Sequence, residues 1–283
     1  MKLRLHAFRL SLCLLVFIFL SSAVLAQTKT RLVENLLMPV EEDSQTTYLD
    51  LLRLIFPDAE PDAATGVVAK RSIALHHVSG DDEGKVYEGE MTISTAEMAW
   101  VKAYGRRRLL MLIDVGTEQG IFTWGDMHVL AVFELKDKPV LKDAVDVQTD
   151  QLVFFDERQP VLAVSTETDA YLIANHHFGG GAGYLNLTLI SLVKDKLRVI
   201  LDKIPTLTND SQCGNNHEEK ASLTLADNPP SGFGNITVNL TRTWRADGAE
   251  CARKTRAGTK NFVHRFVWNE RQQKYVGAPK RRR

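Results

Sequence analysis

The sequence predicts an all-β protein of mainly antiparallel hairpin repeats, propeller-like or sandwich, with one short N-terminal helix. From Val67 onward, apolar and β-branched runs alternate with clusters of Gly, Asp, Asn and Lys, which is typical of strands and turns. Helical patterns do not separate these runs, so a series of βαβ units is excluded. A hairpin-like segment also recurs along the chain, which indicates a repeated β unit.

The first 26 residues have the pattern of a signal peptide. Three basic residues precede the apolar run Leu10–Leu20, and small residues follow, with Val24 and Ala26 at the positions that signal peptidase reads. The apolar run is shorter than the roughly 20 residues of a membrane span, which favours cleavage over an uncleaved anchor. We therefore expect a mature chain that begins at Gln27, is secreted or periplasmic, and has no transmembrane span.

The one predicted helix falls in the N-terminal segment, residues 27–66. Thr46 or Thr47 can cap it and Pro57 ends it, because proline cannot continue a helix. Its apolar residues recur at helical spacing on one face. They are Tyr48, Leu51, Leu52 and Ile55.

Strands are predicted throughout a β-repeat domain, residues 67–276, which a basic tail, residues 277–283, follows. The segment Met91–Tyr104 can be read as a strand or as a helix. The other predicted strands are Val67–Leu75, Leu109–Val115, Val129–Leu135, Leu152–Phe155, Val161–Val164, Tyr171–Ala174, Leu185–Val193, Leu197–Leu201, Ser222–Ala226, Ile236–Trp244 and Phe262–Trp268.

The repeated unit contains an apolar strand, a Lys-Asp-Lys turn and a second apolar strand. It occurs at Ala131–Leu141 and again at Leu189–Val199, an offset of 58 residues, with a weaker copy at His264–Val276. Periods in this range are typical of propeller blades. Four such units would fill the mature chain, which is the lower limit for a propeller, so a β-sandwich stays open as the alternative.

Charge is balanced overall but unevenly distributed. Loss of the signal peptide leaves a formal charge of −3, which gives no reason to expect a nucleic-acid partner. Residues 27–100 hold 14 Asp and Glu against 6 Lys and Arg, whereas residues 242–283 hold 13 Lys and Arg against 3 Asp and Glu. The basic end is either an anchor for an anionic surface or, as we favour, packed against the acidic end or simply solvated.

Two cysteines, Cys213 and Cys251, belong to the mature chain, and in an exported protein such a pair predicts a disulfide. A metal site that also uses His217 and His264 is the alternative. The spacing of these four residues matches none of the compact zinc patterns, so the disulfide is favoured.

Two histidine pairs occur in similar segments, "IALHHVSGD" from Ile73 and "IANHHFGGG" from Ile173. Successive side chains of a strand point to opposite faces, so both histidines of one pair cannot reach the same ion while the strand stays regular. We interpret the segments as equivalent strand ends of a duplicated unit. The alternative is a transition-metal site, zinc for example, built from His76, His77, His176 and His177.

Glycine-rich strand-end loops are the predicted binding sites. The loop at residues 178–184 is followed by a strand and not by a helix, so it does not resemble a phosphate cradle. Loops at residues 76–84, 116–126 and 176–184 have similar places in the repeat. The candidate ligand-binding residues are His76, His77, Asp114, Trp124, Asp126, His176, His177, Phe178 and Tyr184.

No catalytic constellation stands out, because the chain has no nucleophile elbow and both mature cysteines are accounted for. We therefore predict a non-enzymatic protein that needs no cofactor and binds a protein or glycan partner outside the cytoplasm. A metal-dependent hydrolase and a polysaccharide-binding module are the alternatives. The polysaccharide-binding module would use the tryptophans Trp100, Trp124, Trp244 and Trp268. A glycosidase needs two carboxylates, for which the candidates near strand ends are Asp114, Asp126, Asp156 and Glu157.

Overall fold

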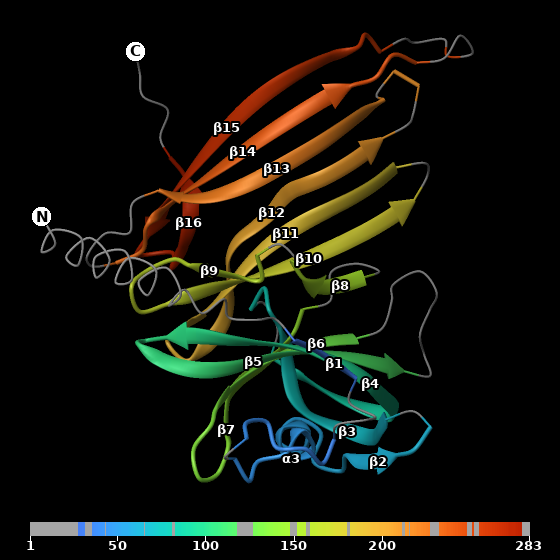
Figure 1. Ribbon diagram of the computed structural model, residues 1–283, viewed down its shortest axis with the longest axis vertical. Helices are drawn as coiled ribbons and strands as arrows, with labels where there is room; N and C mark the ends of the chain where they lie inside the picture. Colours follow the sequence, from blue (N-terminus) through green and yellow to red (C-terminus); the bar gives the residue numbers. More distant parts are fainter. Residues whose placement is uncertain are drawn as a thin grey trace, which may run out of the picture.

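The computed structural model describes residues 28–31, 36–42, 44–64, 66–80, 83–117, 127–147, 152–156, 159–179, 182–210, 213–214, 216–226, 232–247, 251 and 255–278. The predicted signal peptide lies outside these residues, and so does the basic tail except for its first two residues, Gly277 and Ala278. The described chain is almost entirely antiparallel β-structure with one short helix, which confirms the predicted fold class (Figure 1).

Seven strands form the first sheet, in the order β1-β4-β5-β6-β7-β3-β2. Strands β3 to β7 are successive antiparallel neighbours, and β3 also pairs with β7. In such a five-strand series the first and last strands run in the same direction, so the pairing that closes the sheet is parallel. The strands are β1 (Thr28–Arg31), β2 (Glu60–Asp62), β3 (Gly66–His77), β4 (Lys85–Ala103), β5 (Arg106–Thr117), β6 (Met127–Glu134) and β7 (Val140–Asp146).

The helix α3 (Tyr48–Arg53) has its buried face in the core of this closed sheet. Thr47 caps it: the Asp50 amide donates to the Thr47 hydroxyl at 3.2 Å, and the Thr47 amide donates to the Asp50 carboxylate at 2.9 Å. Leu51, Leu52 and Ile55 are fully buried, as their spacing predicted. The N-terminal segment is thus part of the first sheet and its core.

Nine strands form the second sheet, in the order β16-β15-β14-β13-β12-β11-β10-β8, with β9 also paired to β10. Figure 1 shows β10–β15 rising away from the closed sheet as a long twisted layer. The strands are β8 (Leu152–Phe155), β9 (Val161–Ala163), β10 (Asp169–Gly179), β11 (Ala182–Val193), β12 (Lys196–Asp210), β13 (His217–Ala226), β14 (Asn235–Trp244), β15 (Gly258–Asn269) and β16 (Lys274–Gly277).

The two sheets share a core because β5 is buried on both faces. Met111 and Ile113 point into the closed sheet, whereas Leu110 and Leu112 point outward and pack with residues of β10 and β11 such as Ile173. This explains the unbroken apolar run of β5, since a strand covered on both faces does not alternate. A third core lies on the other side of the second sheet.

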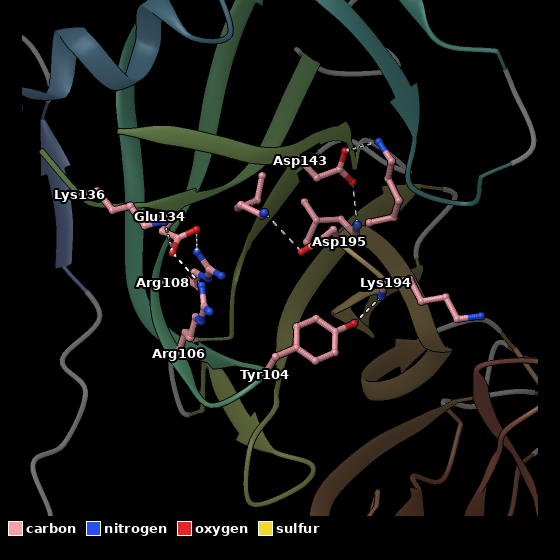
Figure 2. A network of polar contacts seen from close by, with 11 residues as sticks. Tyr104, Arg106, Arg108, Glu134, Lys136, Asp143, Lys194 and Asp195 are labelled. Carbon is pink, nitrogen blue, oxygen red and sulfur yellow. Dashed lines mark hydrogen bonds and ion pairs between the residues drawn. The ribbon is translucent and has the colours of Figure 1, made fainter. Parts of the chain in front are cut away.

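Polar contacts join the β11–β12 turn to the first sheet (Figure 2). The Asp143 carboxylate accepts from the Leu197 amide at 2.7 Å and from the Lys196 ammonium at 3.2 Å. The Lys194 amide donates to the Tyr104 hydroxyl. These contacts fix the base of the long strands against the closed sheet.

The repeated hairpins form where the sequence predicts them, as β6–β7, β11–β12 and β15–β16. The ambiguous segment Met91–Tyr104 lies largely in strand β4, which ends at Ala103. The described strands do not form radial four-stranded blades. They form one closed sheet and one open sheet that pack against each other, an arrangement nearer to the sandwich than to the propeller.

Candidate functional site

The two histidine pairs lie in different sheets. His77 is the last residue of β3, opposite Asp146 of β7, and its Nδ1 contacts the Ser79 hydroxyl at 2.8 Å. His177 lies near the end of β10, and its ring stacks on Tyr184 of β11 with centroids 5.0 Å apart. Both pairs stand at strand ends, as predicted, but their neighbours differ: β3 has a parallel partner, whereas all the described partners of β10 are antiparallel. The two segments are therefore not equivalent positions of one repeat.

The other loop candidates are only partly described. Trp124 and Asp126 lie outside the described residues, and of Phe178 the structure describes the backbone in β10. Asp114 lies on β5 opposite His128, whose Nε2 is 3.6 Å from the Asp114 carboxylate. Among the described residues, no group of three or more His, Cys, Asp and Glu side chains could hold a metal ion.

Cys213 and Cys251 form the predicted disulfide, with their Cα atoms 5.4 Å apart. It joins the β12–β13 turn to the β14–β15 connection at the far end of the second sheet. The Asp247 carboxylate accepts from the Gly214 amide at 2.9 Å and from the Thr255 amide at 2.6 Å, and these backbone hydrogen bonds lower the pKa of Asp247. Because the cysteines are bonded to each other, the alternative metal site that used both is ruled out.

Two of the tryptophans proposed for sugar stacking have their rings covered. The Arg107 guanidinium lies 3.4 Å from the centroid of Trp100, and Phe233 stacks on Trp268 at 3.9 Å. Trp244 is half-buried beside Arg242. Of the proposed glycosidase carboxylates, Glu157 lies outside the described residues. Asp114 lies in the first sheet and the buried Asp156 follows β8 of the second.

A groove opens in the second sheet where β12 separates from β13. Among the described residues these strands pair only between Leu207–Asp210 and His217–Lys220, whereas β13 continues to pair with β14 as far as Ala226. The hollow has a volume of about 350 Å³. It is lined by Asp202 and Ile204 of β12, Glu219 of β13, Val238, Leu240 and Arg242 of β14, and His264 and Phe266 of β15.

The floor of the groove is apolar. Ile204, Val238 and Leu240 are buried, and Phe266 packs against them as part of the third core. Val238 and Leu240 reach this face because side chains of β14 alternate, which leaves Asn239 exposed on the opposite face. The strand alternation of "NITVNLT" therefore supplies the floor.

The rim carries charges of both signs. Glu219 is buried and lies directly opposite Arg242, whose Nε and Nη2 atoms both pair with its carboxylate. The guanidinium lies 5.6 Å from the ring centroids of Trp244 and Phe262. His264 is exposed beside Val238, and the Asp202 carboxylate accepts from the Thr188 hydroxyl at 2.9 Å. Such a rim can bind polar groups that both donate and accept hydrogen bonds.

None of the groove residues was among the loop candidates derived from the sequence. The signal that could have identified them is the pairing of Glu219 with Arg242 on strands that are otherwise amphipathic. It becomes readable only when the register of β13 against β14 is known.

No helix among the described residues is long and apolar enough to cross a lipid bilayer. Comparison with protein-family models, with curated proteins and with solved structures finds no match to this chain.

Proposed function

We propose that this protein is an exported, non-enzymatic binding protein that holds a small amphipathic molecule in the groove between β12 and β15. The observation that carries the proposal is the apolar floor beneath a charged rim, in a hollow of about 350 Å³. Ligand sites are typically concave, largely apolar and equipped with a few polar groups that orient the ligand. Export is supported by the signal-peptide pattern, and the disulfide is compatible with it.

The rim indicates the kind of head group. Arg242 is already paired with Glu219, so the strongest cation of the rim is neutralised within the protein. Asp202 and His264 line the same hollow from opposite walls. An anionic ligand would meet the carboxylate of Asp202, and a cationic ligand would meet the guanidinium of Arg242. We therefore expect a head group that is uncharged or zwitterionic and hydrogen-bonds in both directions.

The alternatives derived from the sequence receive less support. A hydrolase that uses all four histidines would have to draw ligands from two sheets. A polysaccharide-binding surface would need open tryptophan faces, whereas Trp100 and Trp268 are stacked against other side chains.

Calorimetric titration with octanol, octanoate and octylammonium tests the proposal, since the three share an apolar chain and differ in head group. We expect octanol to bind more tightly than either ion. In the His264→Trp variant the added ring enters the groove and should weaken octanol binding by about tenfold or more.

Val263→Trp is the matched control. Val263 precedes His264 on the same strand, is 58% exposed and points to the opposite face, so its variant should bind octanol like the wild type. Equal effects of the two substitutions, or no heat of binding with any of the three probes, would overturn the groove as the binding site.

A further inference from the structure

The first part of β15, from Gly258 to His264, is an unpaired edge of the second sheet in the described chain. Residues Gly258–Phe266 pair with β14 on one side, whereas β16 pairs only with Phe266–Asn269 on the other. Beyond that ladder, one backbone hydrogen bond runs from the Ala278 amide to the Arg265 carbonyl. The edge from Gly258 to His264 has no strand beside it among the described residues.

The bond to Arg265 shows which backbone groups of this edge point outward. In an antiparallel pair, the amide and carbonyl of one residue point to the same side, and consecutive residues alternate between sides. Arg265 points toward β16, so Thr259, Asn261 and Val263 point outward as well. Each of the three presents one donor and one acceptor to solvent, at the spacing that an added strand requires.

The side chains of this edge are basic and exposed. Lys260 and His264 lie on the groove face and Arg265 on the opposite face, and Gly258–Arg265 contains no acidic residue. None of these three side chains has a carboxylate partner within the described part of the chain. Val263, 58% exposed, adds an apolar contact on the same face as Arg265. A second copy of the same edge would bring like charges together, which disfavours self-pairing.

We propose that the Gly258–Arg265 edge binds an extended acidic peptide segment by strand addition. The outward amides and carbonyls of Thr259, Asn261 and Val263 hydrogen-bond its backbone. Lys260, His264 and Arg265 select acidic side chains on its two faces. Main-chain pairing supplies affinity in such complexes and the side chains supply specificity.

The test uses a fluorescent peptide in which glutamate and valine alternate, compared with one in which glutamate and proline alternate. Both carry the same charge, but proline has no amide hydrogen and cannot pair along its length. We expect the valine peptide to bind and the proline peptide to bind at least about tenfold more weakly. On binding, the amide hydrogens of Thr259, Asn261 and Val263 should exchange more slowly.

Asn261→Pro is the decisive variant. The Asn261 amide points outward, so proline there removes a donor to the peptide without breaking the ladder to β14, a position at which edge strands tolerate proline. It should weaken binding about tenfold, whereas Asn261→Ala, which removes the side-chain contact with Thr241, should bind like the wild type.

The double variant Lys260→Glu with Arg265→Glu reverses the charge of the edge. It should abolish binding of the glutamate–valine peptide and permit binding of a lysine–valine peptide. Similar affinities for the valine and proline peptides would mean a purely electrostatic contact and would overturn strand addition. So would wild-type binding by Asn261→Pro, slowed exchange elsewhere with none at the edge amides, or no binding at all.

Discussion

At the scale of single residues, Glu219 illustrates how the groove accommodates a buried charge. Its side chain is 7% exposed, and an ionised carboxylate without partners would be costly there. Two nitrogen atoms of Arg242 contact it, and aromatic rings on β14 and β15 flank the guanidinium. Removal of Arg242 alone would leave the buried carboxylate of Glu219 without a counter-charge. Replacement of both Glu219 and Arg242 by apolar residues would leave no buried charge. The pair therefore has to be treated as one unit.

Glu134 gives a pH dependence that can be tested. The hydrogen bond from Arg108 lowers the pKa of Glu134 from 4.5 to about 2, against the opposing effect of desolvation and with a further contribution from Lys136. Because the folded pKa lies below the unfolded one, this contribution to stability is present above about pH 4.5 and is lost as the pH falls toward about 2. Urea unfolding at a series of pH values measures the free energy of unfolding of the wild type and of Glu134→Gln. The variant should lack the contribution of the ionised Glu134 side chain.

The expected signature is a stability difference between wild type and Glu134→Gln that is largest above about pH 4.5 and shrinks as the pH falls toward about 2. Glu90→Gln is the control, since Glu90 is exposed on β4 and has no ion pair with another described residue. A difference for Glu134→Gln that does not change with pH would contradict this account of the Arg108–Glu134 contact.

At the scale of elements, Asp143 holds the β11–β12 hairpin against β7. Asp143→Ala leaves the Leu197 amide buried without its acceptor, which should cost about 1–3 kcal/mol of unfolding free energy. Lys196→Ala removes only the cation, which is 55% exposed, and should cost about 0–1 kcal/mol. Urea denaturation measures both. Equal losses would mean that the ion pair, and not the backbone hydrogen bond, fastens the hairpin.

Elements with local signals were predictable from the sequence. Helix α3 was recognised because its cap, its apolar spacing and Pro57 all lie within a dozen residues. Strand β8 was predicted with the bounds it has, Leu152–Phe155. Strands β1 and β2 were missed, because "TKTR" and "EPD" show no apolar alternation and are strands only through their neighbours.

The groove could not be predicted, since it depends on contacts between distant elements. Val238 was placed correctly in a strand, whereas the strand predicted as Leu197–Leu201 stopped three residues before Ile204. The two residues line one groove only because β12 separates from β13. Bulges in the β11–β12 ladder, near Asn186 and Leu189, accompany this separation and leave no pattern in the sequence. The histidine pairs were misleading for the same reason: the two segments are similar in sequence but lie in different sheets with different neighbours.

At the scale of the whole molecule, the acidic and basic parts of the chain occupy different sheets. The described residues between Thr28 and Trp100 form β1–β3, most of β4 and helix α3, whereas those from Arg242 onward form the end of β14 and strands β15 and β16 (Figure 1). No ion pair between described residues joins the two parts; Arg242 and Arg245 pair instead with Glu219 and Glu218 of β13. The packing of acidic against basic ends that the sequence suggested is therefore not seen in the described chain, and Lys260 and Arg265 of the basic part are exposed.

The disulfide holds the far end of the second sheet together. The four residue pairs between Leu207–Asp210 and His217–Lys220 are the described pairing of β12 with β13, and the disulfide lies just beyond them. Its cysteines are 38 residues apart, so in the chain-entropy model the bond contributes about 3–4 kcal/mol. The double variant Cys213→Ala with Cys251→Ala should lose about that much unfolding free energy in urea. It should also bind octanol more weakly, because β12 and β13, which the disulfide holds together, both line the groove.

Reductant provides the control for this prediction. It should destabilise the wild type to the level of the double variant and leave the double variant unchanged, because the variant has no bond to break. Mass analysis after alkylation should find no free thiol in the mature wild type until reductant is added. Two freely alkylated cysteines in protein taken from its native compartment, or a double variant as stable as the wild type, would show that the bond does not support the groove. Loss of stability without loss of octanol binding would show that the disulfide stabilises the tip of the sheet but does not affect the groove.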